Sequence, residues 1–137
     1  HDPPRAPPEA VDVIRRADAV IIGPSNPVTS ILPILSCTGI REELVKKKVI
    51  AISPFIGDNP VSGPAAELMQ TMGYGADSRG VKDVYAGLID IFVQDTRDPT
   101  DIPGSYRYDT LMKTPEIAED LMRKVFSLVS GERNTKE

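Results

Sequence analysis

Two proline-containing loops carry most of the residues that could do chemistry. The first, GPSNP, begins at Gly23, follows the apolar run AVII and leads into a helix with hydroxyl side chains at Thr29 and Ser30. Asn26 is suited to cap this helix and Pro27 to occupy its first position, which would leave the next backbone amides pointing outward. Amides and hydroxyls at a helix start are donors for phosphate. The loop therefore predicts an anion site in outline.

The second loop, PFIGDNPVSGP, repeats this arrangement after the apolar run VIAIS. Ser62 or Gly63 can cap a helix whose first residue is Pro64, and Gly63 lets a ligand approach the backbone without meeting a Cβ atom. Ligands of open parallel sheets bind beyond the carboxyl ends of the strands, so both loops are expected at one edge. Each loop also has an interpretation without a ligand, because capping alone stabilises a helix by about 1 kcal/mol.

The binding free energy that a helix terminus can supply limits what these loops can do by themselves. A helix terminus contributes at most about 2 kcal/mol to the binding of an anion. Micromolar affinity requires about 8 kcal/mol. We therefore expect a base pocket, a metal ion or further cationic residues to complete the site, and some of these to lie outside this chain.

A few other polar residues are candidates for sites. Asp95, Asp98 and Asp101 recur every third residue after an apolar run, a pattern that could suit Mg²⁺, although a hydrophilic turn is the favoured interpretation. Arg79 could reach a phosphate, with a surface arginine as the favoured alternative. His1 is the sole histidine and lies in a proline-rich start, which argues against a Ser-His-Asp triad.

Apolar periodicity and turn residues predict the elements that must position these loops. Helices are expected at 9–18, after Pro27, at 40–48, after Pro64, at 80–88 and from Pro115 with Thr114 as its cap; strands are expected at 19–22, 49–53, 89–94 and, as a short edge, 106–108. The strand at 19–22 is expected to be buried on both faces. Helices alternate with strands and hairpin signals such as Asn-Gly are missing, so we predict an α/β fold with a mostly parallel sheet and helices on both faces.

Composition bounds the domain organisation and the function class. The 137 residues fit one domain, with 1–8 and 131–137 as flexible ends. The net charge of −4 and the absence of a basic stripe argue against nucleic acid as a partner; the lysines at 46–48 are interpreted as solvated residues at a helix end. No apolar run reaches the roughly 20 residues of a membrane span, so no membrane partner is expected. The single Cys37, interpreted as a small buried hydrophobe, fits a reducing, cytoplasmic compartment.

Three stretches carry a resemblance to a known family. They are ADAVIIGPSNPVTSILPIL, VIAISPFIGDNPVSGPAAELM and the pair DIFVQD and YDTLM, in this order and spacing. Together they resemble the C-terminal half of the 2-phospho-L-lactate transferase family of coenzyme F-420 biosynthesis, over about residues 17–129. The joint occurrence of GPSNPVTSI and NPVSGPA makes the resemblance specific.

The resemblance implies a Rossmann-like, nucleotide-binding transferase, of which this chain is only the C-terminal part of the family fold. Such an enzyme moves a 2-phospholactyl group from a guanosine diphosphate-activated lactate, lactyl-2-diphospho-5'-guanosine, to the ribityl hydroxyl of the 8-hydroxy-5-deazaflavin precursor and releases GMP, with magnesium assisting. The residues implied to bind substrate are Gly23, Ser25, Asn26, Thr29, Ser30, Ser62 and Gly63. The family's glycine-rich loop GGTGTPKL and its metal-holding aspartate belong to its N-terminal half and are not in this sequence. This implies that the Mg²⁺ ligands lie mainly outside this chain and that the chain alone is an incomplete enzyme.

Several alternatives remain open at this point. The gluconeogenesis-factor-like family shares the strand-Gly-Pro-helix layout but tends toward GPGSLYTSI, and it implies a regulatory protein that binds nucleotide-sugars. A third interpretation is a parallel-sheet half-domain whose open sheet edge pairs with another chain or with a further part of its own. A homodimer, the identity of the three-carbon group and the catalytic residues are also left open.

Overall fold

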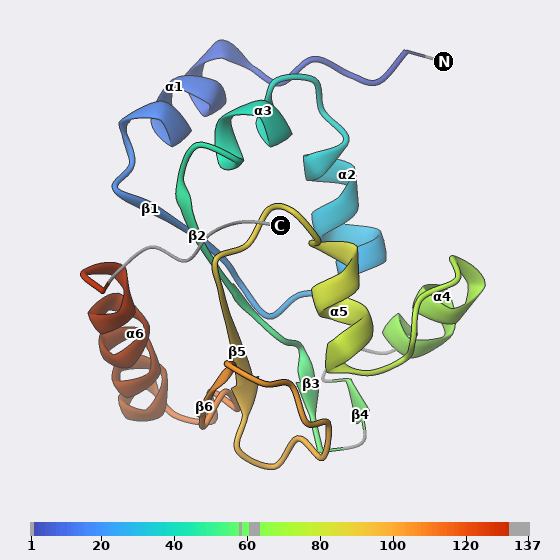
Figure 1. Ribbon diagram of the computed structural model, residues 1–137, viewed down its shortest axis with the longest axis vertical. Coiled ribbons are helices and arrows are strands. Elements are labelled where there is room, and N and C mark those ends of the chain that lie inside the picture. The colour runs from blue at the N-terminus through green and yellow to red at the C-terminus, as the bar shows by residue number, and fades with distance from the viewer. Residues whose placement is uncertain (1, 58, 61–63, 132–137) are drawn as a thin grey trace.

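A parallel sheet organises the molecule. The computed structural model describes residues 2–57, 59, 60 and 64–131, with the backbone alone at 59 and 60. Four strands lie in the order β1-β2-β5-β6, and each neighbouring pair is parallel. Helices lie on both sides of the sheet, with α6 on one side and α2 and α5 on the other (Figure 1). The predicted Rossmann-like α/β architecture is confirmed.

The strands follow the predicted apolar runs closely. Their bounds are Ala19–Ile22 for β1, Lys48–Ile52 for β2, Ile91–Asp95 for β5 and Tyr106–Tyr108 for β6. Ile21 lies opposite Ile50, and Ile50 opposite Ile91, in the two central pairings. All four carboxyl ends therefore meet at one edge of the sheet, which we call the carboxyl edge. β2 and β5 are buried along their whole length, whereas three of the four β1 residues are only half-buried, contrary to the expectation for that strand.

The helices begin where the capping residues predict. The helical elements are α1 (Pro8–Arg16), η1 (Pro27–Ile31), α2 (Leu32–Leu35), α3 (Ile40–Leu44), α4 (Ala65–Thr71), α5 (Ser78–Val84) and α6 (Pro115–Val129). Thr114 Oγ1 accepts a hydrogen bond from Ile117 N at the start of α6. Asp77 Oδ1 likewise accepts one from Gly80 N, and it starts α5 two residues before the predicted helix. No helix among those described is long and apolar enough to cross a membrane.

The core has two parts, one on each face of the sheet. One part packs Val49, Ala51 and Phe92 against the helices α2 to α5. The other packs Ile50, Ile52 and their neighbours on β5 against Leu121 and Val125 of α6. Alternate residues of the same strands supply the two parts, because successive side chains of a strand point to opposite faces. The sheet is thus covered on both faces, as predicted.

A hairpin interrupts the loop after β2. β3 (Phe55–Ile56) and β4 (Asn59–Pro60) pair antiparallel, and Gly57 adopts φ 63° between them. The expectation that all successive strands are parallel is wrong here, because Gly57 followed by aspartate is itself a two-residue hairpin signal. Glycine can take a positive φ without steric cost, and two-residue hairpin turns need that conformation.

Two segments that were expected to be solvated or flexible make specific hydrogen bonds. Lys48 is buried, and its ammonium donates to the carbonyls of Val129 and Gly131 at 3.1 and 2.8 Å, so it caps the end of α6. The interpretation of 46–48 as solvated lysines is therefore wrong for Lys48. In the start of the chain, Ala6 is buried and donates its N–H to Thr38 O at 3.0 Å. The part expected to be a flexible start is therefore held against the body of the protein at this residue.

Candidate functional site

The loop after β1 is shaped by its asparagine. Asn26 is buried, and its Oδ1 accepts hydrogen bonds from Val28 N at 3.0 Å and Thr29 N at 3.3 Å. Ser30 N donates to the main-chain oxygen of Asn26 at 3.0 Å. The predicted cap is confirmed. The amides expected to face outward are therefore not free, because the cap itself occupies them.

The hydroxyls of this loop remain available. Ser25 and Ser30 are half-buried and Thr29 is exposed, and their hydroxyls have no hydrogen-bond partner among the described residues. A Cβ added to Gly23 would meet no atom within 4 Å, so the backbone there borders open space. Five of the predicted site residues thus lie together at the carboxyl end of β1. What they offer a ligand is three hydroxyls, rather than the backbone amides of a helix start.

The second predicted loop can be placed only in part. Ser62 and Gly63 lie outside the described residues. The described helix α4 begins at Ala65, with Pro64 as the residue before it, one position later than predicted. The joint placement of Ser62 and Gly63 with the first loop therefore stays a prediction.

A chain of buried hydrogen bonds joins the end of β2, the start of α5 and the turn after β5. Ser53, at the end of β2, and Ser78, at the start of α5, are fully buried, with their Oγ atoms 2.6 Å apart. Ser78 donates to Asp98 Oδ2, which also accepts from Gln94 Nε2 at 3.0 Å. Phe55 N donates to Ser53 Oγ at 3.2 Å. Because the carboxylate only accepts, both serine protons point toward Asp98, and hydrogen bonds in such a chain strengthen one another.

A small cavity lies beside this chain. Its volume is about 220 Å³, and its walls include Phe55, Gly57, Asp77, Ser78 and Asp98. The hairpin and the start of α5 therefore enclose a polar hollow at the carboxyl edge. This is the position at which α/β proteins bind ligands.

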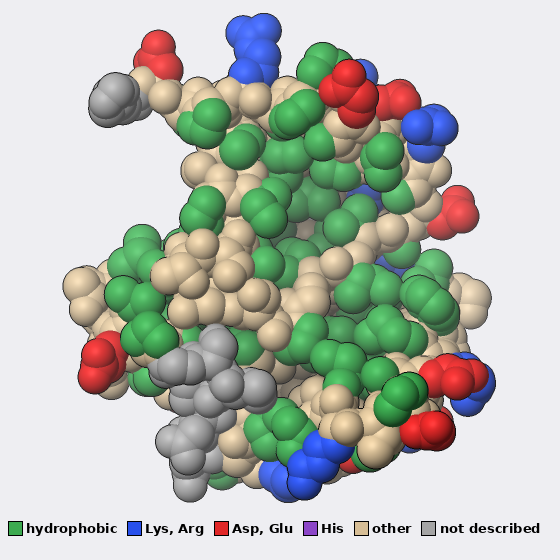
Figure 2. All heavy atoms as spheres, turned by 180° about the vertical axis from the view of Figure 1, so that it is seen from behind, with side chains coloured by type: hydrophobic (Ala, Val, Ile, Leu, Met, Phe, Trp, Pro, Cys, Tyr) green, Lys and Arg blue, Asp and Glu red, His purple; other side chains and the backbone are tan. Residues whose placement is uncertain are grey.

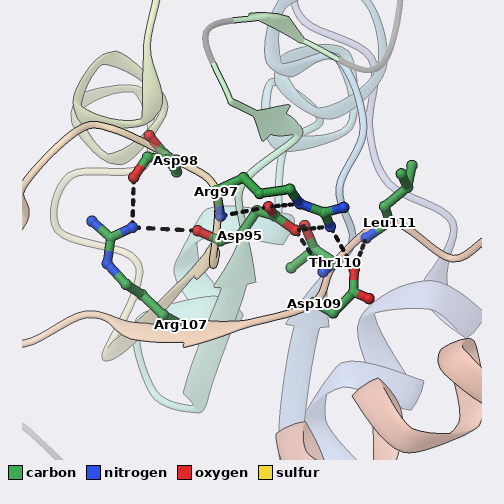
Figure 3. Close-up of polar contacts among 7 residues, drawn as sticks. All are labelled: Asp95, Arg97, Asp98, Arg107, Asp109, Thr110 and Leu111. Carbon is green, nitrogen blue, oxygen red and sulfur yellow. Dashed lines mark hydrogen bonds and ion pairs between the residues drawn. The ribbon is translucent and has the colours of Figure 1, made fainter.

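The carboxyl end of β5 holds a second polar cluster, drawn in Figure 3. The Asp95 side chain is fully buried and binds the guanidinium of Arg97 through two hydrogen bonds, at 2.7 and 2.8 Å. Thr110 donates to the same carboxylate through its amide at 2.9 Å and its hydroxyl at 3.0 Å. Arg97 also reaches Asp109 at 2.6 Å. The cluster ties the turn after β5 to the segment that follows β6.

The pKa values within this cluster have clear causes. Burial alone would raise the pKa of Asp95, but the hydrogen bonds from Arg97 and Thr110 outweigh it and hold that pKa well below its ordinary value. The hydrogen bond to Asp95 raises the pKa of Arg97 above its ordinary value. Both groups are therefore charged at neutral pH. A carboxylate bound in this way is a structural group and a poor proton acceptor.

Arg107 fixes the same turn from β6. Its guanidinium donates to the carbonyls of Asp98 and Thr100 at 2.6 Å each, and to Asp95 O at 3.3 Å. Figure 3 shows this side chain directed across the turn, away from Asp109. The main-chain carbonyls of an irregular segment thus find a partner without a further strand.

These contacts decide the role of the aspartates that recur every third residue. Asp95 and Asp98 are buried and fully engaged, while the main-chain oxygen of Asp101 accepts a hydrogen bond from Arg79. Among the described residues no group of three or more His, Cys, Asp or Glu is placed to hold a metal ion. The donor sets of this part of the chain therefore do not fit Mg²⁺. The contacts agree with the favoured interpretation of these aspartates as part of a turn. This turn is, however, more buried than a hydrophilic turn is expected to be.

Sequence reasoning missed the buried serine chain. Ser53 ends a predicted strand, and Ser78 follows the capping residue Asp77; each has the local signal of a turn residue. Their contact joins residues 25 positions apart in sequence. Cys37 is half-buried against the core, close to its predicted environment. Arg79 is exposed and binds a main-chain carbonyl, in agreement with the favoured surface interpretation.

The fold and the polar loops at the carboxyl edge define this chain as part of a Rossmann-like α/β protein. The family model of 2-phospho-L-lactate transferase CofD matches residues 1–125. The chain therefore belongs to the 2-phospho-L-lactate transferase family.

Individual relatives agree with the family model. The chain is 69% identical over 124 residues to a 2-phospho-L-lactate transferase of Methanospirillum hungatei, a match that covers 90% of this chain and 42% of the relative. It is 51% identical over 120 residues to a protein of the same name from Methanocorpusculum labreanum, covering 87% of this chain and 40% of the relative. The chain thus spans about two fifths of the length of the curated relatives that it matches.

Proposed function

We propose that this chain is part of an enzyme that transfers a 2-phospholactyl group in the biosynthesis of coenzyme F-420. The donor is lactyl-2-diphospho-5'-guanosine, the acceptor is the ribityl hydroxyl of the 8-hydroxy-5-deazaflavin precursor, and GMP is the leaving group. The observation that carries this proposal is the 69% identity to a protein named 2-phospho-L-lactate transferase. The same family match favours the transferase over the nucleotide-sugar-binding alternative.

The loop after β1 suits a role in binding the substrates. Phosphoryl-type transfer depends mainly on positioning and on neutralising charge around the phosphorus. The hydroxyls of Ser25, Thr29 and Ser30 can donate to phosphate oxygens or to the polar side chain of the acceptor, and the open space at Gly23 admits a ligand to the backbone. Asn26 acts indirectly, because its side chain holds the helix start in place.

Magnesium, when bound, would neutralise the diphosphate charge. The described residues offer no fitting ligand set, and we expect its ligands mainly outside this chain and derive no step through it. A reducing compartment such as the cytoplasm suits the single Cys37. A homodimer stays a prediction.

The test uses the complete enzyme that contains this chain, with Mg²⁺ and both substrates. We expect GMP to appear only when the deazaflavin acceptor is present, and phosphorus from the donor to enter the deazaflavin product. GMP release at the same rate without the acceptor would contradict transfer. Calorimetry with GDP and with a UDP-sugar provides a second measurement, in which preference for the UDP-sugar would restore the regulatory alternative.

A second set of measurements tests the residues. We expect Ser30→Ala and Thr29→Ala in the complete enzyme to lower kcat/KM at least ten-fold and to leave the melting temperature within about 1 °C, because exposed or half-buried hydroxyls contribute little to folding. Ser127→Ala, on the exposed side of α6, is the matched control. Unchanged kcat/KM in both loop variants would remove this loop from the site.

A further inference from the structure

The helix after the loop that follows β1 contains a wide turn of a rare kind. η1 is a π-helix, in which Leu32 N donates to Pro27 O five residues earlier and Ile31 N donates to Asn26 O at 3.3 Å. The backbone stays helical into α2, with φ and ψ of −87° and −49° at Ile31 and of −55° and −41° at Leu32. η1 and α2 therefore form one helix over 27–35, and its first part is wider than an α-helix. Such wide turns are uncommon and occur frequently at functional sites.

The burial of apolar side chains does not require this wide turn. The apolar residues of the helix that contact the core are Val28, Ile31, Leu32 and Leu35. Their spacing of three, one and three residues is that of one face of a regular α-helix. A regular α-helix could therefore present the same residues to the core, so the wide turn has another cause.

Pro33 supplies this cause. Proline has no N–H to donate to Thr29 O four residues earlier, and in an α-helix its ring would clash with that carbonyl. Departures from regular helix geometry are found at prolines and at wide π-type turns, and here the two coincide. Pro33 is exposed, so core packing does not account for it. Pro27 does not disturb the helix, because an N–H at the first helical position has no partner within the helix.

The direction of the hydroxyls in this helix matters because the segment carries no charge. No charged residue lies between Asp18 and Arg41 in the sequence. On the face of the molecule that Figure 2 shows, apolar side chains cover much of the middle and charged side chains lie mostly at the rim. A neutral hydroxyl binds through a hydrogen bond, which weakens steeply as its angle worsens, whereas the attraction between charges depends on distance. Thr29 and Ser30 can therefore serve a ligand only if their direction is set by the helix.

We propose that Pro33 is a positioning residue: by widening the turn before it, it directs the Thr29 and Ser30 hydroxyls toward the phosphate groups of the substrates. This inference rests on the proposed transferase function. One residue of an α-helix corresponds to about 100° of rotation. If the turn became regular, Thr29 and Ser30 would rotate by about that angle relative to α2, away from their present direction. Because a misplacement of about 1 Å can lower a rate about 100-fold, a rotation of this size should be measurable.

The substitution Pro33→Ala in the complete enzyme that contains this chain tests the proposal. Alanine restores the N–H and removes the ring, so in a crystal structure of the variant we expect Leu32 N to donate to Val28 O instead of Pro27 O. We expect kcat/KM for transfer to fall at least ten-fold, mainly through kcat. The melting temperature should be no lower than that of the wild type, because alanine favours a helix interior far more than proline does.

Pro115→Ala is the matched control. Pro115 is exposed like Pro33, but it occupies the first position of α6, where proline is well tolerated. The chemical change is the same, and no wide turn depends on it. We expect kcat/KM to change less than two-fold.

A double-mutant cycle shows whether Pro33 acts through the two hydroxyls. In an enzyme that already carries Thr29→Ala and Ser30→Ala, adding Pro33→Ala should change kcat/KM less than two-fold, because the groups that it directs are gone. A merely structural role would lower kcat/KM by the same factor in both backgrounds. That result would overturn the proposal.

The other outcomes are equally decisive. A variant structure that keeps the hydrogen bond from Leu32 N to Pro27 O would overturn Pro33 as the cause of the wide turn. A regular helix with kcat/KM within two-fold of the wild type would overturn the positioning role and leave the proposed function intact. Absence of transfer in the wild-type enzyme would overturn the proposed function and the positioning role together, and the two crystal structures would still show whether Pro33 widens the turn.

Discussion

At the β6 edge of the sheet, charged side chains bind the neighbouring carbonyl and carboxylate groups. At the other edge lies β1, an apolar strand that pairs with β2 alone among the described residues. Arg107 binds three carbonyls of the turn after β5, and Arg97 joins Asp95 to Asp109. Lys124 also lies 5.7 Å from the ring centre of Tyr108 on β6. β1 carries no charged residue at all. The chain therefore satisfies one edge of its sheet with its own side chains, whereas none of the described residues pairs with the other edge.

The comparison also separates residues with a structural role from the candidate binding residues. The polar groups on the β5 and β6 side are buried and engaged with one another, as in Asp95 and Asp98. The hydroxyls after β1 are accessible and have no partner among the described residues. Substitutions on the two sides should therefore affect different properties.

The largest effect on stability is expected for Asp95→Asn. The substitution removes the charge that Arg97 and Thr110 bind, and we expect the free energy of unfolding to fall by about 2–3 kcal/mol at pH 7, measured by urea denaturation. Asp109→Asn is the matched control, since its half-exposed carboxylate binds the same arginine, and it should cost less than about 1 kcal/mol. Equal losses in the two variants would contradict a special role for the buried carboxylate.

The difference in stability between the wild type and Asp95→Asn should depend on pH. Because folding lowers the pKa of Asp95, its ionised form stabilises the fold at pH values above the ordinary pKa of about 4, and this contribution is lost as the pH falls below it toward the folded pKa. We expect the difference between the wild type and Asp95→Asn to be full at pH 7 and to shrink steadily below pH 4. A difference that stays constant down to pH 2 would rule out the charge as its cause.

A smaller loss is expected for Ser78→Ala. It removes the hydroxyl between Ser53 and Asp98 and leaves both without that partner in a buried setting. We expect a loss of about 1–3 kcal/mol in the free energy of unfolding. Ser127→Ala, whose hydroxyl binds only the carbonyl of Lys124 on an exposed surface, should stay within about 0.5 kcal/mol. A neutral Ser78→Ala would show that the chain of hydrogen bonds adds no net stability.

Arg107→Gln should weaken the β6 edge more locally. The loss of its hydrogen bonds to the turn carbonyls should cost about 1 kcal/mol and speed amide exchange in β6 and in the turn. Arg123→Gln, which breaks an exposed ion pair with Glu119 within α6, should cost less than about 0.5 kcal/mol. Unchanged exchange in β6 would mean that strand pairing alone holds this edge.

The smallest changes in stability are expected at the β1 side. Ser25→Ala and Thr29→Ala should each lie within about 0.5 kcal/mol of the wild type, because their hydroxyls have no partner to lose. Asn26→Ala removes a helix cap and should cost about 1 kcal/mol. If Thr29→Ala cost as much as Asn26→Ala, the hydroxyl would be part of the fold and our division between the two sides would be wrong.

The sequence by itself determined the parts of this protein that depend on local periodicity and capping. The apolar runs at 19–22 and 49–53 predicted β1 and β2 within one residue, and the caps at Asn26 and Thr114 predicted two helix starts. These features are encoded within about ten consecutive residues, so they can be derived without knowing the fold. The resemblance of three longer stretches, in their order and spacing, further implied the family and five neighbouring candidate site residues.

Only the tertiary structure decided which polar groups are satisfied and which edge is open. The contact of Ser53 with Ser78 and the cap that Lys48 provides for α6 join segments distant in sequence, and local patterns do not specify such pairs. The spacing of Asp95 and Asp98 resembled a metal site until their buried partners were known. The exposure of β1 depends on what lies beside it in the sheet. The strand order therefore had to be known before its apolar sequence could be placed at an outer edge of the sheet.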